Sequence, residues 1–149
     1  MQFQHVVCVC TGNICRSPLA AGVLKKHVPG LTVSSAGIAA VEGGRMPDEA
    51  AAIAKHAALD LAEHRGRQIT TPIVREADLI LVMEKGQLDW IVSRFPETRG
   101  RVFMATHWVG GDDIADPYRQ SAAFFEQVYS QLDEGVRAWA DRLQPSRGS

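Results

Sequence analysis

FQHVVCVCTGNICRSPLAAGVLKKH, residues 3–27, contains three patterns in direct succession. Phe3 to Val9 is an apolar run typical of a buried strand, and Ser17 to His27 has the spacing of a helix, with Pro18 in its first turn. The few residues between these segments predict a tight loop. A strand that leads directly into a helix is the unit from which parallel sheets are built.

The rest of the chain continues this alternation of short β-branched runs and helical segments. We expect further strands at Leu31–Ser35, Asp78–Met83 and Arg101–Met104, and further helices at Pro47–Ala58, Lys85–Arg94 and about Gln120–Leu143. Strands separated by helices predict an α/β fold in which a parallel sheet is covered on both faces. In such sheets ligands bind beyond the carboxyl ends of the strands, which is where the loop after Val9 lies.

The composition is that of an ordinary globular chain. Its 149 residues, 46% hydrophobic and 22% charged, predict one domain over 1–149, with a flexible polar tail at 144–149. Sixteen Lys and Arg against seventeen Asp and Glu give a net charge of −1, which argues against nucleic acid as a partner. No apolar run reaches the ~18 residues of a membrane-spanning helix, so we expect no membrane insertion.

The cysteines indicate a reducing compartment. There are three of them, Cys8, Cys10 and Cys15, whereas a disulfide framework uses an even number spread along the chain. The N-terminus has no basic segment of the kind that begins a signal peptide. We therefore expect a cytoplasmic location and thiol chemistry.

The loop between the first strand and the first helix has the composition of an anion site. Its backbone N–H groups turn inward at a helix N-terminus, Gly12 permits the conformation, and Arg16 offers a fork for two phosphoryl oxygens. Helix N-termini and cations lower a cysteine pKa from ~8.5 to ~3.5–7.5. The field that binds an oxyanion is therefore expected to ionise Cys10, while Ser17 donates a hydrogen bond to its sulfur.

The same residues have plainer interpretations. A Cys-x5-Arg spacing arises by chance in many proteins, and a cysteine at a strand end usually fills the core, as we expect of Cys8. A zinc site is disfavoured because the chain has no C-x2-C pair. The strand before the loop, the glycine within it and the helix after it favour the anion site.

A carboxylate for proton transfer is expected at Asp116. It precedes Pro117 and Tyr118, and the proline biases Asp116 toward an extended backbone that holds the carboxylate in a defined direction. Its position between the last strand and the last helix places it at the same edge of the sheet as the loop. A simple turn before a helix explains the motif equally well. Asp112 and Asp113 are expected to be solvated loop charges.

Three motifs together resemble the low-molecular-weight protein tyrosine phosphatases: VCTGNICRSP at 9–18, SSAG at 34–37 and DPY at 116–118. The resemblance covers nearly the whole chain, from Val6 to Leu143. Further stretches, HRGRQI at 64–69, LILVMEK at 79–85 and HW at 107–108, resemble the bacterial branch that is encoded with capsule and exopolysaccharide export systems.

This resemblance implies a fold and a mechanism. The fold is a doubly wound, flavodoxin-like single domain with a four-stranded parallel sheet of order 2-1-3-4 and helices on both faces. Cys10 is implied as the nucleophile that forms a phosphocysteine, Arg16 as the phosphate clamp, and Asp116 as general acid and then base. No cofactor or metal is implied. The implied phosphate-binding loop comprises Thr11, Gly12, Asn13, Ile14, Cys15 and Ser17.

The resemblance also implies supporting roles. Asn13 holds the strained loop with help from Ser35 and His64, and Cys15 traps oxidised Cys10 as a reversible disulfide. Val41 and Tyr118 form walls of the cleft. Eukaryotic relatives usually carry a large aromatic residue near the position of Val41, so the resemblance implies a wider or differently shaped cleft in this chain.

The predicted function is hydrolysis of phosphotyrosine in a protein, with a bacterial tyrosine autokinase of polysaccharide export as the implied partner. An arsenate reductase of the same fold needs cysteines after Cys15, and none follows. Protein arginine phosphatases of the family carry threonine where this chain has Ile14, whose apolar side chain favours an aromatic ring. A phosphate-binding module without catalysis is disfavoured because Cys10, Arg16 and Asp116 are all present.

Overall fold

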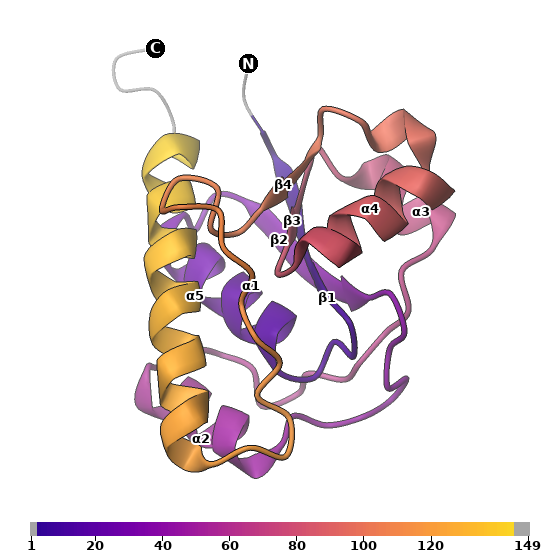
Figure 1. Cartoon of the computed structure of the whole chain (residues 1–149). Helices are drawn as coiled ribbons and strands as arrows, with labels where there is room; N and C mark the ends of the chain where they lie inside the picture. Colours follow the sequence, from indigo (N-terminus) through magenta and orange to yellow (C-terminus); the bar gives the residue numbers. More distant parts are fainter. Residues whose placement is uncertain (1–2, 145–149) are drawn as a thin grey trace.

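The computed structural model describes residues 3–144, in which four parallel strands form one sheet between two layers of helices (Figure 1). The strands are β1 His5–Cys10, β2 Thr32–Gly37, β3 Leu79–Val82 and β4 Val102–Met104. They lie in the order β2-β1-β3-β4, and each neighbouring pair is parallel. The predicted sheet, with its order 2-1-3-4, is therefore confirmed.

Helices cover both faces of the sheet. They are α1 Arg16–His27, α2 Asp48–His56, α3 Thr71–Glu76, α4 Lys85–Arg94 and α5 Ala122–Leu143, with a short 3-10 turn at Pro96–Thr98. In Figure 1, α1, α2 and α5 lie on one side and α3 and α4 on the other. None of the helices within residues 3–144 combines the length and apolar character needed to cross a bilayer.

The inner strand β1 is buried on both faces from Val6 to Cys10, in agreement with the buried strand predicted there. Val6, Cys8 and Cys10 belong to the hydrophobic core under α1 and α5, whereas Val7 and Val9 belong to the core under α3 and α4. Alternate side chains of a strand point to opposite faces, so this strand joins two cores. Cys8 is completely buried in the first core, in agreement with a structural role.

The long helix α5 contributes a stripe of buried residues to the first core. They recur at the helical spacing seen in the sequence: Phe125, Val128, Leu132, Val136, Trp139 and Leu143. Gly135 lets this helix approach the strand layer closely, because a Cβ at this position would lie 2.6 Å from the backbone O of Ala105. The helix begins after Ser121, whose Oγ accepts a hydrogen bond from the backbone N of Phe124.

All eight predicted strands and helices are present, with bounds shifted by a few residues at most ends. Two short elements escaped prediction, α3 and the turn at Pro96–Thr98. Each spans only one or two turns, too short for a periodic pattern, and each begins at or next to a proline. Of the predicted tail, Gln144 donates a hydrogen bond to the backbone O of His27, and 145–149 lie outside the described residues.

Candidate active site

The loop at residues 10–16 joins β1 to α1 at the carboxyl edge of the sheet. Three backbone N–H groups of the segment after β2 donate to its carbonyls: Ile38 to Cys10, Ala39 to Thr11 and Val41 to Gly12, at 2.9–3.0 Å. This close approach requires Gly37, because a Cβ there would lie 2.5 Å from the backbone O of Thr11. The end of β2 therefore fixes the path of the loop.

The loop turns at Asn13, which has a positive φ of 58°. Its buried side chain uses both polar atoms: Nδ2 donates to the hydroxyls of Ser17 and Ser35, at 2.8 and 2.9 Å, and Oδ1 accepts from the backbone N of Arg67 at 2.9 Å. Gly12, which was expected to permit the loop conformation, is not among the described residues with a positive φ. Asn13 adopts the left-handed conformation, and these hydrogen bonds compensate its cost.

His64 supports the same residue from the opposite side. Its Nε2 donates to the backbone O of Asn13 at 2.7 Å. Burial lowers the pKa of His64, and the nearby Arg65 and Arg67 act in the same direction, although the hydrogen bond to Asn13 opposes them. Lowering this pKa favours the neutral ring. The sequence resemblance named Ser35 and His64 as supports of the loop, and both contact Asn13 rather than Cys10.

The sulfur of Cys10 lies at the bottom of the loop with two polar neighbours. The backbone N of Asn13 donates to Cys10 Sγ at 3.2 Å, and Ser17 Oγ lies 2.9 Å from the same atom. Because Ser17 Oγ already accepts a hydrogen bond from Asn13, its proton is available to point at the sulfur. Two donors directed at one sulfur stabilise a thiolate at that position.

The other two cysteines are held as thiols. Burial raises the pKa of Cys8 to about 12, and burial together with the charge of Asp116 raises that of Cys15 to about 12. Neither is therefore expected to compete with Cys10 as a nucleophile at neutral pH. The role of Cys15 as a partner for oxidised Cys10 stays a prediction.

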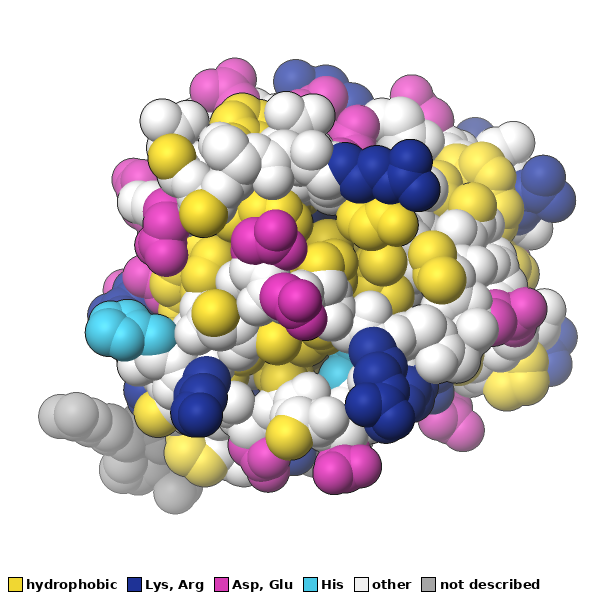
Figure 2. Space-filling model, turned by 90° about the horizontal axis from the view of Figure 1, so that it is seen from below, with side chains coloured by type: hydrophobic (Ala, Val, Ile, Leu, Met, Phe, Trp, Pro, Cys, Tyr) yellow, Lys and Arg dark blue, Asp and Glu magenta, His cyan; other side chains and the backbone are white. Residues whose placement is uncertain are grey.

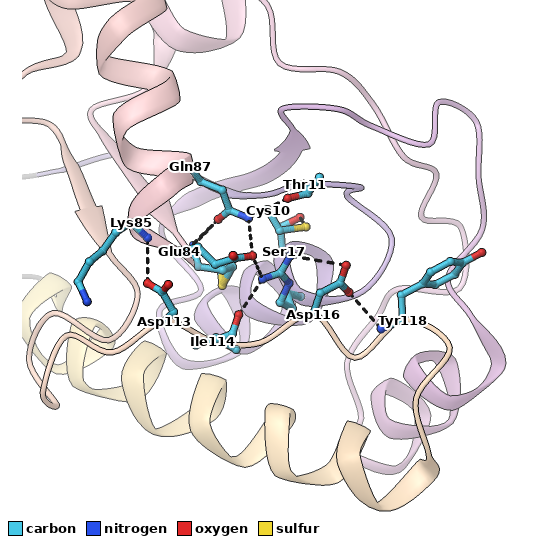
Figure 3. Close-up of polar contacts among 12 residues, drawn as sticks. Cys10, Thr11, Ser17, Glu84, Lys85, Gln87, Asp113, Ile114, Asp116 and Tyr118 are labelled. Carbon is cyan, nitrogen blue, oxygen red and sulfur yellow. Dashed lines mark hydrogen bonds and ion pairs between the residues drawn. The ribbon is translucent and has the colours of Figure 1, made fainter.

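Arg16 is the largest fully buried side chain, with 2% of its surface exposed. Its Nη1 donates to Glu84 Oε2 at 2.5 Å and to the backbone O of Ile114 at 2.7 Å (Figure 3). Both hydrogen bonds use the same nitrogen, while Nη2 lies 3.9 Å from Asp116 Oδ2. The guanidinium is thus held at one end, with its other end next to Asp116.

Glu84 and Gln87 are functional candidates that sequence reasoning missed. Gln87 Oε1 accepts from the backbone N of Met83 and of Glu84, and its Nε2 donates to Thr11 Oγ1 at 3.1 Å and Glu84 Oε2 at 3.3 Å. The Glu84-x-x-Gln87 spacing is a capping box, which is recognisable in sequence. The contacts of Gln87 with Thr11 and of Glu84 with Arg16 are not recognisable in the sequence, because they join residues far apart in the chain.

The turn that follows Asp116 holds its carboxylate. Its Oδ1 accepts a hydrogen bond from the backbone N of Tyr118 at 3.0 Å, and its side chain remains 54% exposed. The neighbouring acids, Asp112 and Asp113, are also exposed. Asp113 is more than a solvated charge, because its Oδ1 accepts from the backbone N of Lys85 at the start of α4.

A cavity of about 180 Å³ opens above the loop, lined by all of residues 10–16 together with Ala39, Val41, Asp116 and Tyr118. Val41 and Tyr118 are 49% and 45% exposed, and the Tyr118 ring points away from Cys10 (Figure 3). From below, hydrophobic side chains surround the hollowed middle of this face, with Asp and Glu side chains among them (Figure 2). Within residues 3–144, no three His, Cys, Asp or Glu side chains are grouped closely enough to hold a metal ion.

Comparison with known proteins gives three findings. A family model described as "Low molecular weight phosphotyrosine protein phosphatase" matches residues 5–148. The chain is 42% identical to the low molecular weight protein-tyrosine-phosphatase Wzb of Salmonella typhimurium, over 98% of both chains. Among similar solved structures is that of Vibrio vulnificus Wzb in complex with benzylphosphonate, with a TM-score of 0.91 and 41% identity over 95% of this chain and 99% of that one. Another is the YwlE arginine phosphatase of Geobacillus stearothermophilus, with a TM-score of 0.87 and 36% identity over 94% of this chain and 92% of that one.

Glu84→Gln tests whether the ion pair with Arg16 orients the guanidinium. Loss of the carboxylate charge, which leaves only a neutral acceptor for Arg16, is expected to lower kcat/KM for p-nitrophenyl phosphate by about 10- to 100-fold. Asp113→Asn is the matched control, because it neutralises a nearby carboxylate that does not contact Arg16. Steady-state kinetics and thermal melting measure the two variants. Unchanged kcat/KM in a folded Glu84→Gln variant would show that the pair has no part in orienting Arg16.

Proposed function

Because the chain belongs to the family of low molecular weight phosphotyrosine protein phosphatases, we propose that it hydrolyses phosphotyrosine in proteins through a phosphocysteine on Cys10. That it is a phosphatase follows from its family. The observation that carries the finer proposal is that Cys10, Arg16 and Asp116 line one cavity of about 180 Å³. A nucleophile, an anion clamp and a proton donor thus face the same small volume.

The first step transfers the phosphoryl group from the tyrosine oxygen to sulfur. The N–H groups of the loop and Arg16 bind the phosphoryl oxygens, and the Cys10 thiolate attacks phosphorus as the bond to the tyrosine oxygen breaks. Asp116 enters protonated and gives its proton to the leaving oxygen. The products are the phosphocysteine, the tyrosine side chain with its proton restored, and an ionised Asp116.

The second step returns the enzyme to its starting state. The ionised Asp116 takes a proton from a water molecule, whose oxygen attacks phosphorus while the sulfur–phosphorus bond breaks. The electron pair of that bond stays on Cys10 as a thiolate, supported by Ser17 Oγ at 2.9 Å and the backbone N of Asn13 at 3.2 Å. Inorganic phosphate leaves, and Asp116 is again protonated.

The walls of the cavity support an aromatic substrate. Its lining includes the apolar side chains of Ile14, Ala39, Val41 and Tyr118, and a phenyl ring between the phosphate and the peptide backbone would contact them. The similar Vibrio vulnificus protein was solved with benzylphosphonate, which joins a phenyl ring to a phosphonate. A phosphoserine offers no such ring and brings less apolar surface to the rim.

Phosphoarginine is the second candidate substrate, because a YwlE arginine phosphatase is 36% identical to this chain and has the same fold. The percentage of sequence identity therefore does not decide between phosphotyrosine and phosphoarginine as the substrate. Ile14 favours phosphotyrosine, because its buried apolar side chain offers no hydrogen-bond partner to a guanidinium. The two substrates are best separated by direct comparison.

The partner we propose is a tyrosine autokinase of bacterial polysaccharide export, dephosphorylated in the cytoplasm. The sequence motifs of the capsule and exopolysaccharide branch support this partner. The 42% and 41% sequence identity to two proteins named Wzb supports it as well. The cavity is large enough for a single phosphorylated side chain, which fits a phosphoprotein substrate. The net charge of −1 does not indicate a nucleic acid instead.

The proposed roles of Cys10 and Asp116 predict different kinetic signatures. Cys10→Ser is expected to abolish turnover and still bind inorganic phosphate, because the loop amides and Arg16 remain. Asp116→Ala is expected to slow turnover by about 10²- to 10⁴-fold, least for aryl phosphates with acidic leaving groups, which need no proton. Rates over a series of aryl phosphates measure this dependence, with Asp112→Ala as control. Full activity of Asp116→Ala on phosphotyrosine would require another acid.

The substrate class is tested with one peptide that carries phosphotyrosine, phosphoserine or phosphoarginine at the same position. Phosphotyrosine is expected to be hydrolysed fastest, as measured by phosphate release. Ile14→Thr places a hydroxyl on the rim and is expected to shift the ratio toward phosphoarginine. Equal or faster hydrolysis of phosphoarginine by the unaltered chain would reverse the proposed specificity.

A further inference from the structure

A second cavity, of about 510 Å³, lies apart from the loop chemistry, between α1, β2, the turn after α2 and residues 64–67. Its volume falls within the range of small-molecule sites in proteins. Part of its wall is apolar, and includes Leu59 and Leu61, which pack against α1 where Gly22 leaves room for them. The cavity shares no lining residue with the active-site cavity.

The charged side chains around this cavity are mostly positive. Lys25, Lys26, Arg65 and Arg67 line it, with Asp60 as the single carboxylate among its lining residues. The ion pairs found among residues 3–144 involve Arg16 and Arg137 and leave out these four cations. Among the described residues none of these four cations is therefore in an ion pair, and the single carboxylate of Asp60 leaves an excess of positive charge around the cavity.

Three of the four cations are oriented by neutral partners. Lys26 Nζ donates to the backbone O of Ala57, Arg67 Nε to that of Ser35, and Arg65 Nη1 to that of His64, at 2.7–2.8 Å. A carbonyl fixes the position of a cationic group without cancelling its charge. The cavity thus has a partly ordered positive rim, which favours an anion.

We propose that this cavity binds a small organic anion, with an apolar body against Leu59 and Leu61 and a carboxylate, sulfonate or phosphate head group among the cations of its rim. The apolar wall is suited to the body of this ligand, and the positive rim is suited to its anionic head group. Neither feature is used by the proposed phosphatase mechanism.

The cavity is connected to the active site through Asn13. Three of its lining residues, Ser35, His64 and Arg67, hydrogen-bond to Asn13 at 2.7–2.9 Å. An anion held among the cations draws residues 64–67 toward α1 and β2, and so strengthens the support of the left-handed turn. Bound anion is therefore expected to lower KM and to tighten binding of inorganic phosphate. By linkage, inorganic phosphate is expected to tighten binding of the anion by the same factor by which the anion tightens binding of phosphate.

Binding is tested by calorimetry with 1-naphthalenesulfonate, and with the neutral 1-naphthalenesulfonamide as the matched probe. The sulfonate is expected to bind more tightly than the sulfonamide.

Lys25→Gln combined with Arg65→Gln removes two exposed cations of the rim and is expected to weaken binding by about fivefold or more. Arg75→Gln combined with Arg99→Gln, which makes the same change in net charge away from the cavity, is expected to leave binding unchanged. Binding is measured without turnover, so its failure is distinct from failure of the proposed phosphatase function.

Kinetics distinguish the two places where the sulfonate can bind. Occupation of the second cavity lowers KM for p-nitrophenyl phosphate, and the rim double variant requires more sulfonate for the same effect. Binding in the phosphate loop instead raises KM and is competed by inorganic phosphate. A raised KM, equal binding of the two probes, or equal binding by the two double variants would each overturn the proposal.

Discussion

The backbone of Asn13 turns the loop above β1 through a φ of 58°, which costs a residue with a side chain about 1–2 kcal/mol. Hydrogen bonds to Ser17, Ser35, Arg67 and His64 hold it in this conformation. The turn directs the N–H of Asn13 at the sulfur of Cys10. The shape of the anion site and the surroundings of the sulfur therefore depend on the same strained residue.

The buried guanidinium of Arg16 depends on a second set of contacts. Glu84 compensates its charge, and the carbonyl of Ile114 fixes its direction. Gln87 orients Glu84 and also reaches Thr11, so the start of α4 is joined to the phosphate loop by side chains alone. Groups held in place before substrate arrives need little rearrangement in the transition state, which is the usual source of electrostatic catalysis.

Local sequence signals sufficed for much of this structure. The apolar run of β1, the glycine-containing loop and the start of α1 are contiguous, so their arrangement follows from chain order and from the rules for parallel sheets. The sheet order came from the family resemblance, and the structure confirms it. Short segments such as α3 were not predicted, because one or two helical turns are too short to show a periodic pattern of apolar residues.

Long-range contacts set the limit of prediction for the site. Arg16 and Glu84 are 68 residues apart, and no local pattern indicates that they meet. The left-handed turn lies at Asn13, which takes it with the help of partners from three separate segments. The family resemblance named Asn13 as the residue that holds the loop, whereas the local pattern of the loop did not show where its backbone turns. The cations of the second cavity are likewise brought together only by the fold, from α1 and from residues 64–67.

The account depends most directly on a thiolate at Cys10 in the free enzyme. The pH dependence of its alkylation by iodoacetamide, followed by mass spectrometry of the peptide that contains it, measures this state. Cys8 and Cys15, whose pKa values burial raises to about 12, are expected to react slowly. We predict a rate that is already high in mildly acidic buffer and changes little up to neutral pH. A rate that rises only in alkaline buffer, as for a free thiol with a pKa of about 8.5, would contradict the account.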